Sequence, residues 1–394
     1  MRRGGYLTRP VLRFKGGTAL TPLEGFKLGL KPFRGERRVR VYVFSRASTA
    51  KSSLEMVENL ANGVKGYGGM SSWFNCDLEV EGVVKVQSNE DYVKAAEEVG
   101  DVDLVLAFIP DEMSVEYDED PYMPLKRVLA SRGMPSQMIE ESTCRYMRAN
   151  SYVLFNLALS IYSKAGGIPW VLDERTYFDC TIGFDSGGGG VVVTSTFSNP
   201  FSFTWTMGSQ TVEGLAEAIA SSVKPSWGVK TMAIHKDGPI MDWELEAVRR
   251  AISKLDRRGI VKDAKWSLFE VKSRFTPRIL GASGLNLYNP EKGVYVQLDK
   301  FKAIVATTGF PERPLNPAQS PVRPIMVEAV EGSWWDFDFV KALTDVYWLS
   351  ELHWASGFTS TRLPISTLYA KRMCSFWRAG VKPASRLYGR LWFL

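Results

Sequence analysis

A chain of 394 residues is long enough to form two domains, each with a core of its own. Hydrophobic residues make up 45% of it and charged residues 23%, which is the balance of an ordinary soluble globular protein. No apolar run reaches the length of a transmembrane helix, and the first residues lack the apolar core of a secretory signal, so we expect a cytoplasmic protein. The two histidines argue against a histidine-rich zinc site, and the four scattered cysteines indicate reduced thiols.

The formal net charge of +6 is unevenly distributed along the chain. Residues 1–46 hold 12 basic and 2 acidic residues, and residues 371–394 hold 6 basic residues and no acidic one. The stretch between them is acidic, with 31 basic against 41 acidic residues. Basic segments suit a polyanionic ligand because each neutralised phosphate releases counterions, although a solvated basic tail has the same composition.

The first part of the chain reads as an arm followed by an α/β domain. Residues 1–35 are rich in Gly, Pro and basic residues, and we interpret them as an extended arm packed on the body. Residues 36–167 then show apolar strands that alternate with helical patterns, which indicates a parallel, doubly wound sheet. The strands are expected at 39–46, 82–88 and 102–110, and the helices between them at 52–64 and 89–100.

Four polar side chains stand out in the second half of this domain. Tyr122 and Lys126 are four residues apart on a predicted helix and therefore project from one face of it. Gln137 opens the next apolar run, and Lys164 comes near the end of a further helix. One phenol, one amide and two ammonium groups combine directional donors with positive charge. The set predicts a pocket for a terminal phosphate.

The second domain, residues 168–394, opens with a strand, a turn and a strand at 177–199. Its glycine run at 187–190 invites comparison with a phosphate-binding loop, but no helix follows the run and neither glycine-rich nucleotide signature is present. We therefore interpret the run as a hairpin turn. Helices and strands alternate after it, and this order indicates an RNase H-like fold.

Together these features resemble the Argonaute and Piwi family. The four polar residues are similar to the pocket in its MID domain that anchors the 5′-phosphate of a guide strand. Three segments resemble its PIWI domain, namely IGFDSGG (182–188), AIHKDGPI (233–240) and LPISTLYAKRM (363–373). Residues 1–35 resemble the opening of short prokaryotic Argonautes, and no room remains for a PAZ domain before the first strand. The resemblance implies a Rossmann-like MID domain followed by an RNase H-like PIWI domain.

The resemblance also implies where a nuclease centre would lie. Catalytic acids of the family stand where Asp185 and Asp237 stand here, and in active members two Mg²⁺ ions activate water. Lys371 takes the fourth ligand position, and its ammonium group repels a cation. Lys371 is expected to occupy the metal's place and pair with one of the two aspartates, or to contact the target backbone. A third acid would be Glu213 or Glu217, although both also fit the surface of an amphipathic helix.

The end of the chain carries a further expectation. In the family the terminal carboxylate can help to hold a metal ion against the guide phosphate, so the resemblance implies that Leu394 contributes to an Mg²⁺ site. A buried apolar terminus is explained equally well by simple packing.

The sequence therefore predicts a protein that anchors a 5′-phosphorylated RNA or DNA guide and recognises a complementary target without slicing it. The resemblance implies a role in defence against invading nucleic acid, with a partner protein that supplies a missing lobe or an effector. The alternative is a metal-dependent, guide-directed endonuclease that uses Asp185, Asp237 and one of the two glutamates. In a third interpretation, a plain nucleotide-binding protein binds a mononucleotide as tightly as an oligonucleotide.

Overall fold

The computed structural model describes residues 3–114, 119–198, 201–309, 312–316, 320–358 and 360–394. Residues 1 and 2 of the predicted arm and Asn199 of the predicted hairpin therefore lie outside the described residues. The chain divides into two compact units, and neither is a continuous segment. The nine-stranded unit comprises Met1–Val11, Leu172–His353 and Thr359–Ser375, and the four-stranded unit comprises Leu12–Val171, Trp354–Phe358 and Phe376–Leu394.

The sequence-based bounds of 1–35, 36–167 and 168–394 stay a prediction, and the contacts divide the chain differently. Residues 376–394 join the four-stranded unit although they lie more than 200 residues beyond most of it. Residues 1–11 join the nine-stranded unit, where β1 (Arg3–Tyr6) pairs antiparallel with β16. The remainder of the predicted arm is ordered as β2 (Leu12–Phe14), β3 (Gly17–Ala19) and α1 (Pro22–Lys27).

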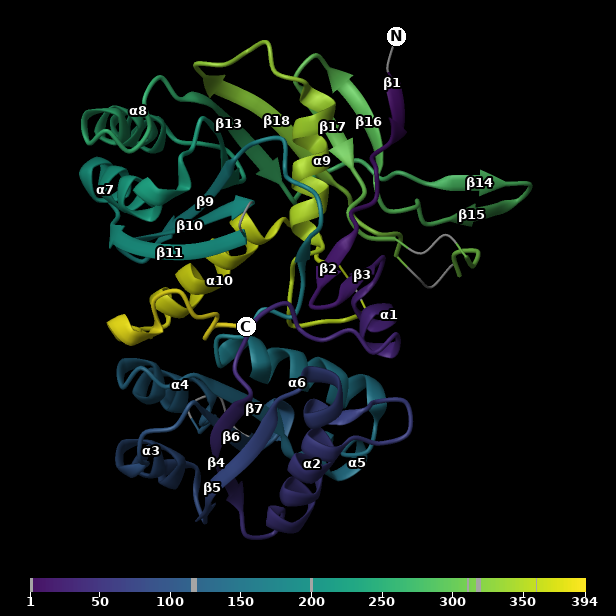
Figure 1. Ribbon diagram of the computed structural model, residues 1–394, viewed down its shortest axis with the longest axis vertical. Helices are drawn as coiled ribbons and strands as arrows, with labels where there is room; N and C mark the ends of the chain where they lie inside the picture. Colours follow the sequence, from purple (N-terminus) through teal and green to yellow (C-terminus); the bar gives the residue numbers. More distant parts are fainter. Residues whose placement is uncertain (1–2, 115–118, 199–200, 310–311, 317–319, 359) are drawn as a thin grey trace. The chain divides into compact units, whose positions relative to one another are not determined.

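A parallel sheet in the order β5-β4-β6-β7 forms the centre of the four-stranded unit. Every position of β6 is buried, as expected for a strand with helices on both faces of its sheet. Helices α3 and α4 pack together on one side of the sheet, and α2 and α5 lie on the other (Figure 1). The doubly wound fold predicted from the alternation of strands and helices is thus confirmed. The elements are β4 (Arg38–Arg46), α2 (Ala50–Asn62), β5 (Asp77–Val86), α3 (Asn89–Glu98), β6 (Leu104–Ile109), α4 (Tyr122–Ser131), β7 (Ser136–Glu140), α5 (Glu141–Tyr146) and α6 (Ser151–Lys164).

Shorter elements complete this unit. A π-helical turn spans Met70–Phe74, and 3₁₀ turns span Glu112–Ser114 and Ser385–Leu387. The short strand β8 (Val171–Leu172) lies where the chain passes from one unit to the other.

The sheet of the nine-stranded unit runs in the order β1-β16-β17-β18-β13-β12-β9-β10-β11. Strands β9, β10 and β11 form an antiparallel meander, and β12 and β13 add parallel to β9. This arrangement confirms the predicted RNase H-like fold. The elements are β9 (Cys180–Gly187), β10 (Gly190–Ser198), β11 (Phe201–Ser209), α7 (Val212–Ser222), β12 (Thr231–Asp237), α8 (Asp242–Arg257), β13 (Lys265–Lys272), β14 (Gly281–Ser283), β15 (Asn286–Tyr288), β16 (Val294–Asp299), β17 (Lys302–Val305), β18 (Ile325–Gly332), α9 (Phe339–Ser350) and α10 (Ile365–Arg378), with a 3₁₀ turn at Pro225–Trp227.

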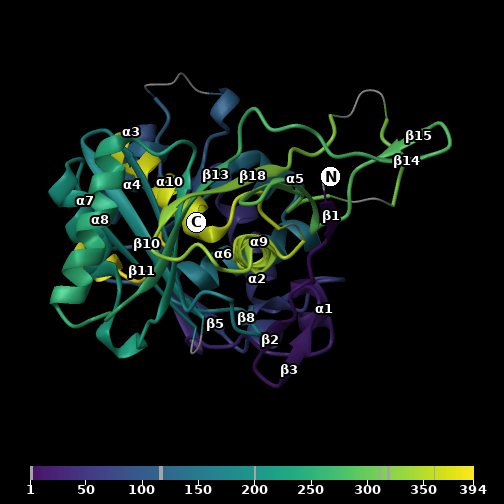
Figure 2. The same cartoon turned by 90° about the horizontal axis from the view of Figure 1, so that it is seen from above.

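Helices α7 and α8 lie side by side in both views (Figures 1 and 2) and share one apolar core with the sheet. Leu215 and Ile219 on α7 and Val248 and Leu255 on α8 are fully buried in this core. Their spacings of four and seven residues give each helix one apolar face, which explains why the sheet and the two helices pack as layers. Among the described residues, no helix combines the length and the apolar character needed to cross a bilayer.

Strand β11 was not predicted from the sequence. Its segment FSFTWTMGS alternates aromatic and polar residues, and Phe201 and Trp205 are buried, so the period-two signal was present but short. The hairpin turn at the glycine run is confirmed, because β9 and β10 pair up to Gly187 and Gly190.

Candidate functional site

Lys126, Gln137 and Lys164 meet around the first residues of β7. Lys126 lies on the buried face of α4, Lys164 ends α6, and each is only 2% exposed. Both Nζ groups donate hydrogen bonds to the Ser136 carbonyl, at 3.3 and 3.0 Å. Lys164 Nζ also donates to Gln137 Oε1 at 2.7 Å. The structure brings three of the four predicted residues together, and their binding of a phosphate stays a prediction.

The C-terminal segment contributes to the surroundings of Lys126. Lys126 Nζ donates to the Trp392 carbonyl at 3.0 Å, and it lies 5.4 Å from the centre of the Phe376 ring and 5.7 Å from that of Trp392. Carbonyl oxygens and aromatic faces attract an ammonium group, but less strongly than an anion does. Residues 376–394 are therefore part of this site.

Two buried hydroxyl groups of residues in β7 and α6 have no hydrogen-bond partner among the described residues. One is Ser136 Oγ, on the residue whose carbonyl accepts from both ammonium groups. The other is Ser163 Oγ, one residue before Lys164. Buried polar groups are normally hydrogen-bonded, so each of these hydroxyls calls for a partner such as an ordered water or a polar ligand.

Tyr122 begins α4, one helical turn before Lys126, and its backbone N–H donates to Asp120 Oδ1 at 2.9 Å. Its half-buried side chain lines a cavity of about 390 Å³. Glu112, Asp120 and Glu140 also line this cavity. Their negative charges disfavour a phosphate inside the cavity itself, so a phosphate would have to lie on the lysine side of Tyr122.

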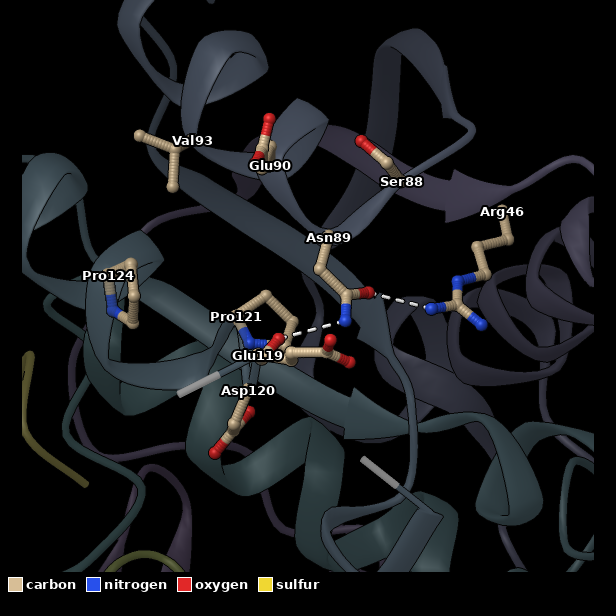
Figure 3. A pocket seen from close by; sticks show the side chains of 9 residues that line it. All are labelled: Arg46, Ser88, Asn89, Glu90, Val93, Glu119, Asp120, Pro121 and Pro124. Carbon is tan, nitrogen blue, oxygen red and sulfur yellow. Dashed lines mark hydrogen bonds between the residues drawn. The ribbon is translucent and has the colours of Figure 1, made fainter. Parts of the chain in front are cut away.

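A second cavity of the four-stranded unit, of about 440 Å³, lies where β4 ends and α3 begins (Figure 3). The Asn89 amide joins its walls, accepting from Arg46 Nη2 at 2.7 Å and donating to the Glu119 carbonyl at 2.8 Å. The lining includes the carboxylates of Glu90, Glu119 and Asp120 against the single cation of Arg46. This balance of charge makes the cavity a poor phosphate site, even though it lies at the start of a helix.

Leu394, predicted to help hold Mg²⁺, is half-buried at the chain end. Its N–H donates to the Leu391 carbonyl at 3.1 Å. The bond between Lys126 and the Trp392 carbonyl fixes the backbone two residues before the terminal carboxylate. Carboxylate and phosphate oxygens are ligands that Mg²⁺ accepts, so the donor type fits the ion, and the site itself stays a prediction.

The nine-stranded unit brings Asp185 and Asp237 to one edge of its sheet. Asp185 lies near the end of β9 and Asp237 ends β12, and the two strands are parallel neighbours. Side chains at the carboxyl ends of adjacent parallel strands meet at the same edge. The side chains of Asp185 and Asp237 are 14% and 11% exposed, respectively.

Helix α10 starts directly against this sheet, because a glycine makes room for it. A Cβ atom on Gly183 would lie 2.2 Å from the Ser366 carbonyl oxygen, so no larger residue fits there. The same carbonyl accepts from Thr194 Oγ1 at 2.7 Å, and Ser366 Oγ lies 2.9 Å from His235 Nδ1. Residues of β9, β10 and β12 thus position the start of α10. Lys371 follows Ser366 by about one and a half helical turns.

Lys371 Nζ lies 2.6 Å from Asp237 Oδ2, so the expected pairing of this lysine with an aspartate is present. A second lysine, Lys236, stands beside the other aspartate. Its Nζ lies 3.7 Å from Asp185 Oδ1 and 3.9 Å from Glu244 Oε1, and it donates to the Asp237 carbonyl at 3.0 Å. Two ammonium groups are therefore interleaved with three carboxylates.

Glu213 and Glu217, the predicted candidates for a third acid, lie elsewhere. Both accept from Lys254 Nζ, and Glu217 also pairs with Arg258. Hydrogen bonds from these cations lower the pKa of Glu217 to about 2. Lys254 stands ten residues beyond Glu244 on α8, or about 15 Å along the helix axis. The two glutamates thus belong to a surface network, and the acid that shares Lys236 with Asp185 is Glu244.

Residues 105–382 match the family model described as the Piwi domain, which is more than half of the chain. The chain belongs to the Piwi domain family. A Piwi protein of Archaeoglobus fulgidus is 24% identical over 298 residues, covering 68% of this chain and 67% of that protein.

Solved structures of the Piwi family share the fold. This chain is similar over its whole length to 55% of Clostridium butyricum Argonaute, bound there to a guide DNA and a 19-mer target DNA, with a TM-score of 0.76 and 24% identity. Over 99% of its length it is similar to 56% of Drosophila Piwi, with a TM-score of 0.73 and 17% identity. This Piwi-domain chain thus spans little more than half the length of these two proteins.

The side chains at Asp185 and Asp237 do not fit the two-metal centre of a Piwi-domain nuclease. Such a centre needs several carboxylates free to offset the charge of two cations. Here Lys371 and Lys236 already place positive charge against the aspartates. Within the described part of the chain, no cluster of three or more His, Cys, Asp or Glu side chains is arranged to hold a metal ion.

Sequence reasoning missed Lys236 and Glu244. Lys236 directly precedes Asp237 in AIHKDGPI, so its closeness to one aspartate was visible, but its reach to Asp185 depends on the pairing of β9 with β12. Glu244 stands in the first turn of α8, where an acidic residue is ordinary, and its complete burial could not be inferred from its spacing.

Proposed function

We propose that this Piwi-domain protein anchors the 5′-phosphate of a guide strand and uses that strand to recognise complementary nucleic acid without cutting it. The observation that carries the proposal is the convergence of the Lys126 and Lys164 ammonium groups and the Gln137 amide on one buried point of the four-stranded unit. The two ammonium groups suit a terminal phosphate, and Gln137 holds one of them in place by accepting from Lys164. The unsatisfied hydroxyl of Ser136 belongs to the residue whose carbonyl accepts from both ammonium groups, which leaves a polar group of this residue for a ligand or a water.

A structure with a similar fold supports the proposal that this chain binds a guide strand. The similar structure of Clostridium butyricum Argonaute holds a guide DNA and a target DNA. If this chain holds its strands in the same way, base pairing between the strands supplies the sequence specificity, and the protein reads the backbone.

The first test compares short single strands, RNA and DNA, that carry either a 5′-phosphate or a 5′-hydroxyl. The wild type is expected to bind the phosphorylated strand at least about tenfold more tightly, because charge-assisted hydrogen bonds contribute about 1.5–3 kcal/mol each. Lys126→Met plus Lys164→Met removes both ammonium groups but keeps the buried side-chain volume. In this variant the preference for phosphate is expected to disappear.

A matched control separates this effect from general electrostatics. Lys51→Ala plus Lys65→Ala removes the same charge from exposed positions of the same unit, and the phosphate preference is expected to remain. Thermal unfolding of each variant shows whether the fold is kept. Equal binding of both strand ends by the wild type would refute the proposed anchor, and mononucleotide binding as tight as oligonucleotide binding would favour a plain nucleotide-binding protein.

The proposal includes Mg²⁺ beside the guide phosphate, with the Leu394 carboxylate as one ligand. When bound, the ion would neutralise charge shared by the phosphate and the carboxylate. Chelation is then expected to weaken binding of the 5′-phosphorylated strand and to leave the 5′-hydroxyl strand unchanged. An equal effect of chelation on both strands would contradict a specific ion at this end.

The absence of slicing is proposed from the two lysines at the aspartates. A guide-loaded protein is expected to leave a fully matched target intact in Mg²⁺ and in Mn²⁺, because Lys371 and Lys236 repel the cations that the reaction needs. Cutting by the wild type that disappears in Asp185→Ala would establish the alternative, a guide-directed metal nuclease.

The family resemblance extends the proposal to a partner protein and to defence against invading nucleic acid. Purification of the protein from its own cells as a single protein component, with or without nucleic acid, would contradict the partner. Unchanged sensitivity of those cells to plasmids and phages after loss of the gene would contradict the defence role.

A further inference from the structure

Phe275, in the loop after β13, combines two features that rarely occur together. Its side chain is 102% exposed, and its backbone φ is 56°, in the left-handed region. A bulky residue at positive φ is an outlier, since glycine adopts this conformation without steric cost. Sparsely populated backbone conformations persist where the surrounding structure imposes them, and they cluster at functional sites.

The loop is anchored on both sides of Phe275. Ser273 is buried, at 5% exposure, and Thr276 Oγ1 donates to the Pro324 carbonyl at 2.8 Å. The aromatic ring is therefore presented to solvent by a fixed backbone and is not the end of an unattached loop.

Phe275 lines a cavity of about 440 Å³ in the nine-stranded unit, together with the paired side chains of Asp237 and Lys371. Lys272 lines it as well and is held by Glu270 at 2.5 Å and Glu328 at 3.1 Å. The carboxylates in and beside the cavity thus already have lysine partners.

One arginine of the lining, and a second one near Asp237, provide further positive charge. Arg274 lines it next to Phe275 and is exposed. Burial and the nearby charges of Arg323 and Arg278 lower the pKa of Arg362, while the charge of Asp237 raises it, so Arg362 lies within electrostatic reach of this aspartate and of two further arginines. In the described ranges of the chain, no ion pair joins any of these four arginines to a carboxylate.

We propose that Phe275 is a stacking platform for one unpaired base of a nucleic-acid strand whose phosphate contacts Arg274 beside it. The inference rests on the proposed function and adds a second contact point, in the nine-stranded unit. An aromatic face accepts any base, and nearby cations follow the backbone, which is the usual way of holding a single strand. The base must be unpaired or terminal, because bases inside a duplex already stack on their neighbours.

The test is a scan with abasic nucleotides in single strands bound to the full-length protein. The wild type is expected to bind about 5- to 100-fold more weakly when the abasic nucleotide takes the place of the stacked base, and only there. Phe275→Ala is expected to bind the intact strand as weakly as the wild type binds the strand with the abasic nucleotide at the stacked position. An abasic nucleotide at that position should then weaken binding by the variant no further. Phe275→Tyr keeps a planar ring and should preserve the position-specific loss, whereas Phe275→Leu should not.

Comparing strands with a 5′-phosphate and a 5′-hydroxyl distinguishes failure of this inference from failure of the proposed function. The effect of Phe275→Ala is expected to be the same for 5′-phosphate and 5′-hydroxyl strands, whereas the variant of Lys126 and Lys164 acts only on the former. Phe275→Gly should bind as weakly as Phe275→Ala but raise the unfolding temperature, because glycine relieves the backbone. Unchanged binding by Phe275→Ala, or an abasic profile that it leaves intact, would overturn the proposal and favour a protein partner at this face.

Discussion

At the scale of single residues, the chemistry around Asp185 and Asp237 depends on the charge of their neighbours. Lys371 reaches Asp237 from α10, and Lys236 reaches Asp185 from the adjacent strand. A lysine stabilises a carboxylate by its positive charge, as a metal ion does. It cannot, however, lower the pKa of a coordinated water or coordinate a carboxylate and a phosphate oxygen at the same time. In this structure each of the two carboxylates thus has a lysine partner.

His235 predicts how stability depends on pH. It is 1% exposed, and burial lowers its pKa to about 3, so it stays neutral in the folded protein. An unfolded chain protonates this histidine below a pH of about 6.5, and the unfolded state then binds more protons than the folded state. The contribution of neutral His235 to the free energy of unfolding is therefore complete above a pH of about 6.5 and declines as the pH falls toward 3.

The measurement is urea unfolding of the wild type and of His235→Gln at several pH values between 7 and 4.5. The free energy of unfolding of the wild type is expected to fall more steeply with decreasing pH, by up to about 1.4 kcal/mol per pH unit relative to the variant. Parallel curves for the two proteins would show that His235 is not the titrating group.

At the scale of elements, Glu244 connects the start of α8 to the site. Its carboxylate accepts from the Met241 N–H at 3.0 Å and from Ser186 Oγ at 2.9 Å, and it lies 3.9 Å from Lys236 Nζ. It thereby satisfies a backbone donor at the helix start and places a negative charge at the positive end of the helix dipole. One side chain links α8, β9 and β12.

Glu244→Ala is expected to lower the free energy of unfolding by about 3 kcal/mol, because it leaves a buried lysine and a backbone donor with fewer partners. The matched control is Glu246→Ala on the same helix, which removes the exposed pair with Arg250 and is expected to cost less than about 1 kcal/mol. Chemical unfolding measures both. Equal losses in the two variants would contradict a special role of Glu244.

At the scale of the whole molecule, the chain interleaves its two units. It enters the four-stranded unit after Val11, returns to the nine-stranded unit at Leu172, and contributes residues 376–394 to the four-stranded unit at its end. The two basic segments seen in the sequence, 1–46 and 371–394, are each divided between both units. Each unit therefore receives part of both basic segments, and the positive charge is not confined to a tail.

The sequence alone predicted the features that repeat over short distances. The alternation of strands and helices, the turn at the glycine run and the spacing of Tyr122 and Lys126 all follow from periods of two and 3.6 residues, which reflect local hydrogen bonding and side-chain direction. The order of these elements indicated a doubly wound sheet and was compatible with an RNase H-like fold, because few arrangements satisfy a given order of strands and helices. The resemblance of three segments to the PIWI domain then implied the second fold.

Only the tertiary structure decided which distant residues share a site. The bond from Lys126 to the Trp392 carbonyl joins groups 266 positions apart, the reach of Lys236 to Asp185 depends on strand pairing, and the left-handed backbone of Phe275 depends on anchors outside its loop. None of these has a local period to reveal it. They arise because packing many weak contacts into one core selects a single three-dimensional arrangement, and sequence spacing carries no information about distances across that core.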